Sequence, residues 1–160
     1  MQSFYWLIPG VLAGCGLPGR AGRMHGPADA VARDLAWLRA QGIAALLSLT
    51  EQPLDAVLLQ QCGMAFLHLP VLDMTPPSPE QLLQAIAFID HHRAHDSPVA
   101  VHCLMGQGRT GTVLAAYLIR EGTSPAEALA MVRAVCPGAV ENRLQEQALV
   151  EFAERRDWLV

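Results

Sequence analysis

The amino-acid sequence predicts an α/β fold in which a central, mostly parallel sheet is flanked by helices. Short apolar segments typical of buried strands alternate with longer segments in which apolar residues recur at helical spacing. Glycine and proline separate most of these segments. Such alternation is typical of parallel strands joined by helical connections. At 160 residues the chain is long enough to bury a substantial core, and we expect residues 1–160 to form a single domain.

Short apolar segments are expected to form the strands. Only Pro9 and Gly10 separate the first two segments, which favours a hairpin at the start of the chain. The Gly-rich residues 16–27 carry Arg20 and Arg23 and predict a mobile loop. The predicted strands cover residues 4–8, 11–15, 43–49, 65–69 and 99–101.

Serine, proline and glycine mark the ends of the expected helices. The pairs Ser78-Pro79 and Ser124-Pro125 each combine an N-cap with a first-turn proline, and Gly42 and Gly122 suit helix ends. Four prolines make residues 70–79 an irregular loop. The predicted helices cover residues 27–41, 54–61, a segment that begins at 79, and then 110–121, 124–135 and 141–158.

The charge composition excludes several classes of function. The net charge of −4 argues against a nucleic-acid partner, which requires a basic face. All 11 basic residues are arginine, so a Schiff-base lysine, a Walker-type phosphate loop and a kinase-type lysine are excluded. Any preference for an anion must therefore be local.

The distribution of cysteine and of apolar residues predicts the compartment. The four cysteines form no Cys-x-x-Cys pair and lie far apart, at positions 15, 62, 103 and 136. Reduced thiols and a cytoplasmic protein are therefore expected. The start of the chain has no basic segment, so we expect no signal peptide. The longest apolar run, residues 113–119, is too short to cross a bilayer. We expect a monomer without a membrane partner.

Residues 102–111 are the most informative stretch of the chain. Cys103 and Arg109 stand six positions apart, with Gly106 and Gly108 between them and no charged residue in the interval. A predicted strand leads in and a predicted helix leads out. Such a turn points backbone N–H groups at one place beside the positive end of a helix dipole, which binds an anion and favours a thiolate over a thiol. The sequence therefore predicts covalent phosphoryl transfer through Cys103.

The neighbouring residues have expected roles in this chemistry. Arg109 offers a planar fork of donors for two phosphate oxygens. Thr110 places a hydroxyl beside the sulfur to stabilise the departing thiolate, and His102 orients the loop from behind. The loop itself is expected to bind phosphate, largely through backbone N–H groups, at Leu104, Met105, Gly106, Gln107, Gly108 and Arg109.

Asp73 is the expected proton donor. It lies thirty positions before Cys103, in the proline-stiffened loop, from which it can protonate the leaving group and later accept a proton from water. The competing interpretation is a turn-forming Asp. Asp90 and Asp96 are rivals, but we expect them on the solvated surface. This scheme needs neither a metal nor a cofactor.

Other polar clusters allow simpler interpretations. His91, His92 and His95 have helical spacing that suits a metal, but residues of this type are equally natural in a last helical turn, and we predict no metal site. Arg20 and Arg23 are interpreted as loop surface, with contact to an anionic substrate as the alternative. The remaining cysteines are expected to be inert core residues.

The motif His102-Cys103-x5-Arg109-Thr110-Gly111 resembles the signature of the protein tyrosine phosphatase superfamily. Nearly the whole chain is similar to small atypical dual-specificity phosphatases, notably over residues 4–10, 12–14, 47–51 and 73–79. The resemblance implies a cysteine-based (dual-specificity) phosphatase fold, with Cys103 as nucleophile, Arg109 as phosphate binder and Asp73 as general acid. It also implies that Glu141 or Gln145 helps to position the hydrolytic water.

The substrate class is narrowed but not fixed by the sequence. The shallow cleft of the small family members implies phosphorylated proteins or peptides that carry phosphoserine or phosphothreonine as well as phosphotyrosine. Leu104, Met105 and Gln107 are neutral, which disfavours multiply charged lipid headgroups and polyphosphate ends. An RNA 5′-triphosphatase, a phosphoinositide phosphatase and a phosphate-binding pseudoenzyme remain the alternatives. A rhodanese-like sulfur transferase fits the sequence poorly.

Overall fold

The computed structural model describes residues 1–155, and its central sheet has five strands in the order β1-β2-β7-β5-β6. Only β1 runs antiparallel to its neighbour, because the Pro9-Gly10 turn folds it back on β2; the other pairs are parallel. The mostly parallel sheet predicted from the sequence is therefore confirmed. The strands are β1 (Tyr5–Ile8), β2 (Leu12–Cys15), β5 (Ala45–Ser48), β6 (Ala65–His68) and β7 (Val99–His102).

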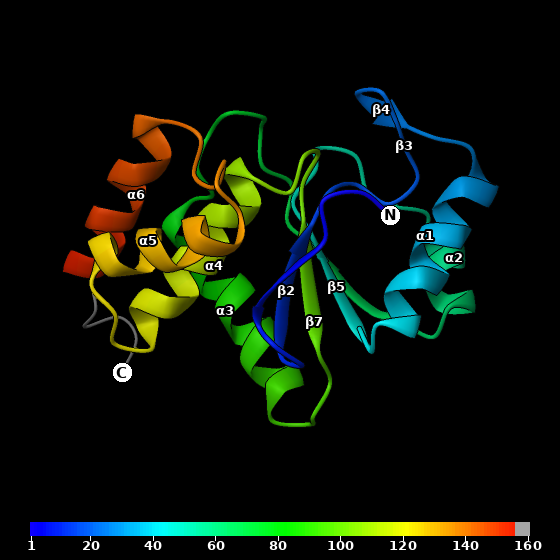
Figure 1. The fold of residues 1–160 in the computed structure, drawn as a ribbon, viewed down its shortest axis with the longest axis horizontal. Helices are drawn as coiled ribbons and strands as arrows, with labels where there is room; N and C mark the ends of the chain where they lie inside the picture. The colour runs from blue at the N-terminus through cyan, green and yellow to red at the C-terminus, as the bar shows by residue number, and fades with distance from the viewer. Residues whose placement is uncertain (156–160) are drawn as a thin grey trace.

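Helices cover both faces of the sheet (Figure 1). The two helices α1 (Ala28–Ala40) and α2 (Ala56–Gln61) lie on one face. The other face carries α3 (Pro79–Arg93), α4 (Gly108–Arg120), α5 (Pro125–Val135) and α6 (Arg143–Glu154). Successive strand residues point to opposite faces, so Leu46 packs in the α1–α2 core while Leu47 packs in the core on the side of α3–α6.

Helix α4 is the central helix of the larger layer. All its residues from Gly108 to Ile119 are buried, and it packs against α3, α5 and α6. A helix that is apolar on all sides is stable only when it is covered in this way. The N-terminus of α4 is therefore held firmly at the carboxyl end of β7.

The starts of α3 and α5 agree with their capping signals, whereas those of α4 and α6 are shifted by two residues. Ser78 with Gln81, and Ser124 with Glu127, form complete capping boxes. α4 begins at Gly108 instead of the predicted residue 110, so Arg109 belongs to its first turn. α6 begins at Arg143, after an Asn142 cap, instead of at residue 141. The predicted end of that helix, including Trp158, lies outside the described residues.

Residues 16–27 differ from the predicted mobile loop. They contain a short two-stranded hairpin of β3 (Arg20–Ala21) and β4 (Met24–His25), with Gly22 in the left-handed region at φ 62°. The Asp34 carboxylate accepts a hydrogen bond from the Gly19 N–H at 2.7 Å and ties the hairpin to α1. Sequence reasoning missed these strands because each has only two residues.

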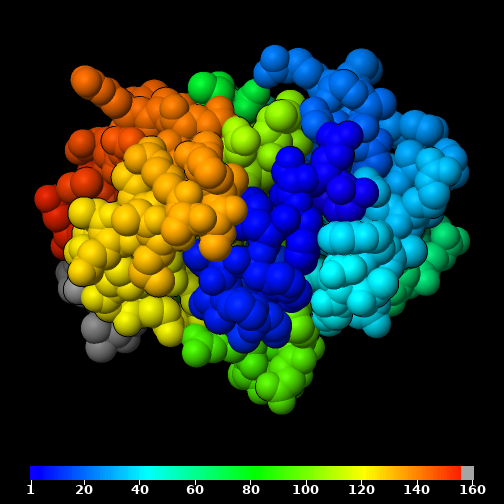
Figure 2. Space-filling model, viewed as in Figure 1, coloured from blue at the N-terminus to red at the C-terminus, as the bar shows by residue number. Residues whose placement is uncertain are grey.

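The edge strand β1 lies against α5. The space-filling view shows the N-terminal segment between α5 and α1 (Figure 2), and β1 and α5 contact each other directly. Within residues 1–155, no helix combines the length and the apolar character that crossing a membrane requires.

Candidate active site

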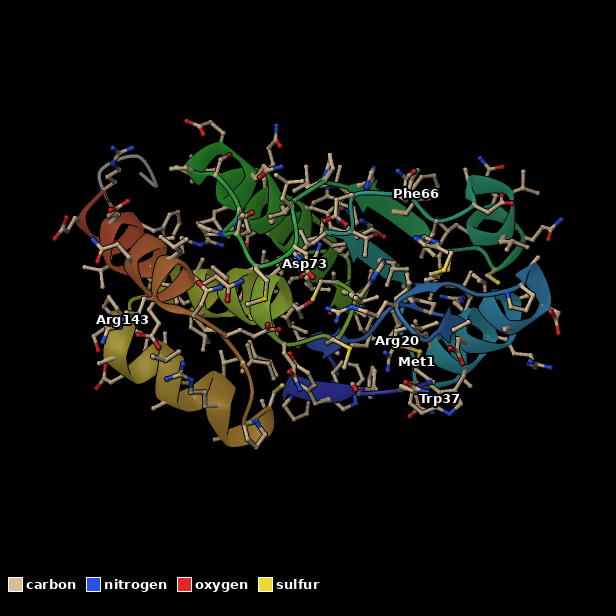
Figure 3. The ribbon with its side chains drawn as sticks, turned by 90° about the horizontal axis from the view of Figure 1, so that it is seen from above. Met1, Arg20, Trp37, Phe66, Asp73 and Arg143 are labelled. Atoms are coloured by element: carbon tan, nitrogen blue, oxygen red, sulfur yellow. The ribbon has the colours of Figure 1, made fainter. Side chains whose placement is uncertain are left out.

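The site lies at the carboxyl edge of the parallel strands. β7 leads into Cys103, and the neighbouring strand β5 leads into Thr50 and Glu51. The segment that follows β6 passes back over the same edge of the sheet and carries Asp73. Figure 3, which views this edge from above, shows Asp73 near the middle of the molecule, with Arg20 and Arg143 on opposite sides of it. Open α/β sheets place ligands at this edge.

Two carbonyl groups of residues 103–109, here called the Cys–Arg loop, point outward to donors on neighbouring segments. The Leu17 N–H donates to the Leu104 oxygen at 3.0 Å, and the Tyr5 hydroxyl donates to the Gly106 oxygen at 2.7 Å. No described peptide bond is cis, and in a trans peptide the N–H points opposite to the carbonyl. The N–H groups of the next residues, Met105 and Gln107, therefore point to the inner side of the loop. This arrangement forms an anion-binding concavity.

The loop needs glycine at position 106. Gly106 has φ 75°, and a Cβ atom there would lie 2.5 Å from the backbone carbon of Cys15. Glycine adopts this conformation without strain. The close approach presses the loop against the end of β2.

Arg109 is buried beneath the edge with its guanidinium held by several acceptors. Only 2% of the residue is exposed. Nη1 donates to the Val71 oxygen at 2.9 Å, and Nη2 lies 3.0 Å from Asp73 Oδ1. The structure thus brings together the predicted phosphate binder and the predicted general acid.

Glu51 is a site residue that the sequence analysis did not single out for a role. Its Oε1 accepts the Asp73 N–H at 2.7 Å and lies 3.6 Å from Arg109 Nη1. Partial burial opposes ionisation, but backbone N–H groups and the Arg109 guanidinium outweigh it and hold the pKa of the Glu51 carboxyl below its usual value. The sequence signal that could have identified Glu51 is its position just after β5, the strand that pairs in parallel with β7. Glu51 links the Asp73 loop to Arg109.

Asp73 lies beside Arg109, whereas the two alternative acids, Asp90 and Asp96, lie elsewhere. The Asp73 side chain is 44% exposed, with Oδ2 3.8 Å from Arg23 Nη2. Asp90 instead pairs with Arg120, and Asp96 lies just before β7, at the opposite end of that strand from Cys103. Geometry therefore excludes both rivals from the site.

His102 is buried between the end of β5 and the first residue of the Cys–Arg loop. Its Nε2 is 2.7 Å from Ser48 Oγ, and its Nδ1 is 3.2 Å from the Cys103 oxygen. Complete burial lowers its pKa from 6.5 to about 4, so the ring is neutral at pH 7. Because a carbonyl can only accept, Nδ1 carries the proton and Nε2 accepts from the Ser48 hydroxyl.

Three buried polar atoms near the loop have no hydrogen-bond partner within residues 1–155. They are Arg109 Nε, Thr110 Oγ1 and Gln145 Nε2. Buried donors are normally satisfied, so such a group of orphans calls for an explanation. A bound anion that accepts hydrogen bonds supplies one.

Glu141 and Gln145 reach the loop from the start of α6. Glu141 Oε1 accepts the Gly108 N–H at 3.0 Å, and Gln145 Oε1 accepts the Glu141 N–H at 2.7 Å. Both side chains would crowd a Cβ atom on Gly108, at 2.9 Å. The structure thus places both predicted supporting residues beside the N-terminus of α4.

A pocket of about 550 Å³ opens beside Arg109. Its lining includes Arg23, Met24 and His25 of the β3–β4 hairpin, together with Glu51 and Asp73. The apolar surface comes largely from Leu17, Met24 and Leu104. Arg23 therefore borders the site, whereas Arg20 donates to Gly22 and Gln2.

The other three cysteines and the cluster of His91, His92 and His95 lie outside the anion-binding concavity of the Cys–Arg loop. Cys15 and Cys136 are buried behind the Cys–Arg loop, and burial raises the pKa of both thiols. Cys62 caps the end of α2. His95 Nδ1 lies 2.7 Å from the His91 oxygen. Among the described side chains, no group of three or more His, Cys, Asp or Glu residues could hold a metal ion.

An α/β sheet with a Cys-x5-Arg loop at the start of a buried helix defines a cysteine-type phosphatase fold. A family model described as "Polymorphic toxin system, DSP-PTPase phosphatase" matches residues 19–123. The chain belongs to this family of dual-specificity and tyrosine phosphatases.

Individual relatives agree with this placement. Dual specificity protein phosphatase 22-B from Danio rerio is 34% identical over 139 residues, covering 80% of this chain and 72% of its own length. Tyrosine-protein phosphatase cdc-14 from Caenorhabditis elegans is 31% identical over 86% of this chain, which spans only 20% of that relative. Phosphatidylglycerophosphate phosphatase PTPMT1 from Arabidopsis thaliana is 32% identical over 77 residues, or 48% of this chain and 23% of its own length.

A solved structure shows the same fold. The crystal structure of Tk-PTP in its active form superposes with a TM-score of 0.82 at 34% identity, covering 96% of this chain and 97% of that one. These matches support a small atypical dual-specificity phosphatase. A closer likeness to dual specificity protein phosphatase 23, which the sequence suggests, is tested by none of them and stays a prediction.

Proposed function

We propose that the protein hydrolyses phosphomonoesters without a metal, through a cysteinyl-phosphate formed on Cys103. The observation on which the proposal depends is the loop itself: the segment from Cys103 to the start of α4 combines backbone N–H groups inferred to point inward, the buried Arg109 fork and buried polar atoms without a described partner. A phosphoryl group fits these donors by charge and by geometry.

In the first step the Cys103 thiolate attacks phosphorus. An S–P bond forms, the P–O bond to the leaving group breaks, and Asp73 gives its proton to the leaving oxygen. In the second step water attacks phosphorus and gives a proton to Asp73, while the S–P bond breaks. The Thr110 hydroxyl stabilises the departing thiolate, and Glu141 and Gln145 help to place the water. Phosphate is released and the thiolate is restored.

In this mechanism the contact between Asp73 and Arg109 opens when a phosphoryl group binds. In the free protein the Asp73 carboxylate lies 3.0 Å from Arg109 Nη2. A phosphate dianion competes for the same guanidinium and releases the carboxyl group for its role as proton donor. Arg109 Nη1 stays on the Val71 oxygen, so the guanidinium keeps its position while its anionic partner changes.

The pocket favours phosphotyrosine in a protein or peptide, with phosphoserine and phosphothreonine as further substrates. Met24 and Leu104 line the pocket beside Arg109, and apolar surface of this kind suits a phenyl ring. The high exposure of Met24, 72%, leaves the pocket open on this side, which suits shorter phosphoamino acids.

A second candidate is a phospholipid phosphomonoester. The observation that favours it is the similarity to a plant phosphatidylglycerophosphate phosphatase over about half of the chain. The neutral Leu104, Met105 and Gln107 within the loop argue against headgroups with several phosphates, and equally against an RNA 5′-triphosphate.

A panel of substrates with a chelator present tests the proposal. We expect turnover of an aryl phosphate and a phosphotyrosyl peptide, slower turnover of a phosphoseryl peptide, and little of phosphatidylglycerophosphate vesicles. Cys103→Ser should abolish turnover, while the matched change Cys62→Ser, at the end of α2, should leave it intact. Activity in Cys103→Ser would overturn the mechanism, and a preference for the vesicles would select the second candidate.

The role of Asp73 has its own test. Asp73→Asn should lower kcat most for substrates with poor leaving groups, because these need the proton. It should also remove the alkaline limb of the pH profile. Asp96→Asn, at the other end of β7, is the matched control. A pH profile unchanged by Asp73→Asn would reject the assignment.

A further inference from the structure

The Tyr5 hydroxyl makes a hydrogen bond that spans a hundred residues and ends on the Cys–Arg loop. It donates to the Gly106 oxygen at 2.7 Å, and the two residues are separated by 101 positions. Tyr5 belongs to the edge strand β1, which contributes no other contact to the loop among the hydrogen bonds of the described residues. Nothing in the chemistry of phosphoryl transfer requires an edge-strand tyrosine at this place.

The surrounding residues leave room for this side chain. Tyr5 is paired across the sheet with Gly14, and a Cβ atom on Gly14 would lie 2.4 Å from Tyr5 Cζ. The tyrosine ring therefore crosses over the glycine to reach the loop. Any larger residue at position 14 would displace it.

The hydroxyl is a permanent donor. Burial, followed by the neighbouring Cys136 thiol, raises the pKa of Tyr5 well above its ordinary value. The Cys136 Sγ approaches the same Gly106 oxygen at 3.9 Å, where it is at most a weak second donor. The strong hydrogen bond to this carbonyl thus comes from Tyr5.

The hydrogen bond to the Gly106 carbonyl fixes the orientation of the Gln107 N–H. Gly106 has φ 75° and lies against the end of β2, so its peptide is fixed on one side by packing and on the other by Tyr5. Because the peptide is planar and trans, fixing the Gly106 oxygen outward points the Gln107 N–H inward. That N–H is one of the donors expected to contact the phosphoryl oxygens.

We propose that Tyr5 is a positioning residue of the Cys–Arg loop, and that its hydroxyl holds the Gly106–Gln107 peptide in the orientation that binds the phosphoryl group. The proposal rests on the phosphatase mechanism given above. Tyr5 does not touch the substrate in this scheme, and it acts only through the Gln107 N–H.

The test compares Tyr5→Phe with Tyr117→Phe, since the chain has only these two tyrosines. Both substitutions remove one hydroxyl and keep the ring. The Tyr117 hydroxyl accepts from Arg93 at 2.6 Å and lies near the far end of α4, nine residues after Gly108. It is therefore a matched control without contact to the loop.

The readouts are kcat and KM for an aryl phosphate, the inhibition constant of tungstate as a phosphate mimic, and Tm. Misplacing a catalytic group by about 1 Å can cost on the order of 100-fold in rate. We expect Tyr5→Phe to lower kcat/KM about 10- to 100-fold, mainly through kcat, and to weaken tungstate binding several-fold. Tyr117→Phe should change neither constant, although both variants lower Tm.

An NMR titration with tungstate separates positioning from general loosening. In the wild type the Gln107 amide resonance should move strongly on binding, and in Tyr5→Phe it should move little. Wild-type kinetics and tungstate affinity in Tyr5→Phe, or losses equal to those of Tyr117→Phe, would overturn the proposal. If the wild-type protein binds tungstate but hydrolyses nothing, the phosphatase mechanism fails while the amide titration still tests Tyr5.

Discussion

His102 should make the stability of the fold depend on pH in the weakly acidic range. Its imidazole is fully buried between Ser48 and the Cys103 carbonyl, and burial lowers its pKa from 6.5 in the unfolded chain to about 4. The neutral ring is the form that the folded protein accommodates. Acidification protonates the unfolded chain first, so the stability present above pH 6.5 is lost progressively as the pH falls toward 4.

The size of this loss follows from the two pKa values. Each pH unit over which only the unfolded chain is protonated costs about 1.4 kcal/mol. The free energy of unfolding should therefore fall by about 2 kcal/mol between pH 7 and pH 5, and by about 3 kcal/mol by pH 4. Urea denaturation at these pH values measures it directly.

Two variants isolate the contribution of this one side chain. His102→Asn keeps a donor toward the Cys103 carbonyl but cannot titrate, so its unfolding free energy should be lower at pH 7 and should fall by about 2 kcal/mol less than that of the wild type between pH 7 and pH 5. His91→Asn, on the exposed surface of α3, should keep the wild-type slope. An equal slope in wild type and His102→Asn would refute the reasoning.

Three further substitutions test separate parts of the site. Gly106→Ala should lower the free energy of unfolding by about 1–3 kcal/mol and remove most of the activity. The reason is that Gly106 has φ 75° and that an added Cβ would lie 2.5 Å from the Cys15 backbone. Wild-type turnover in this variant would contradict the loop geometry. Glu51→Gln should strengthen inhibition by inorganic phosphate a few-fold at low salt, because it removes a negative charge 3.6 Å from Arg109. We expect kcat to fall in this variant. Unchanged inhibition would show that Glu51 does not act on the anion site. Met24→Ala should raise KM for aryl phosphates about fourfold, or about 0.8 kcal/mol, without affecting alkyl phosphates; equal effects on both would remove Met24 from the ring-binding surface.

The sequence predicts much of the fold because the signals involved are local. Ser78 and Ser124 mark helix starts through capping boxes, and the Pro9-Gly10 turn marks the first hairpin. Likewise, the Cys–Arg spacing predicts the loop between β7 and α4. The boundary of α4 is less accurate, because Gly108 starts the helix without a side-chain cap.

The contacts that connect distant segments could not be predicted. Glu51 has no role predicted from the sequence, and the pairing of β5 beside β7 brings it to Arg109 and the Asp73 N–H. Tyr5 likewise has no role predicted from the sequence, and its hydrogen bond to Gly106 depends on the absence of a side chain at Gly14. Such contacts depend on register and on tertiary packing, which leave no local pattern in the sequence.

The most direct test of the mechanism is the detection of the covalent intermediate. Wild-type protein and Cys103→Ser are mixed with a large excess of an aryl phosphate, quenched within milliseconds and analysed by peptide mass spectrometry. The mechanism predicts a phosphoryl group on the peptide that contains Cys103, formed at the rate of the burst of phenol release and absent from Cys103→Ser. Rapid turnover without any phosphoryl adduct on Cys103, or an adduct on another residue, would contradict it.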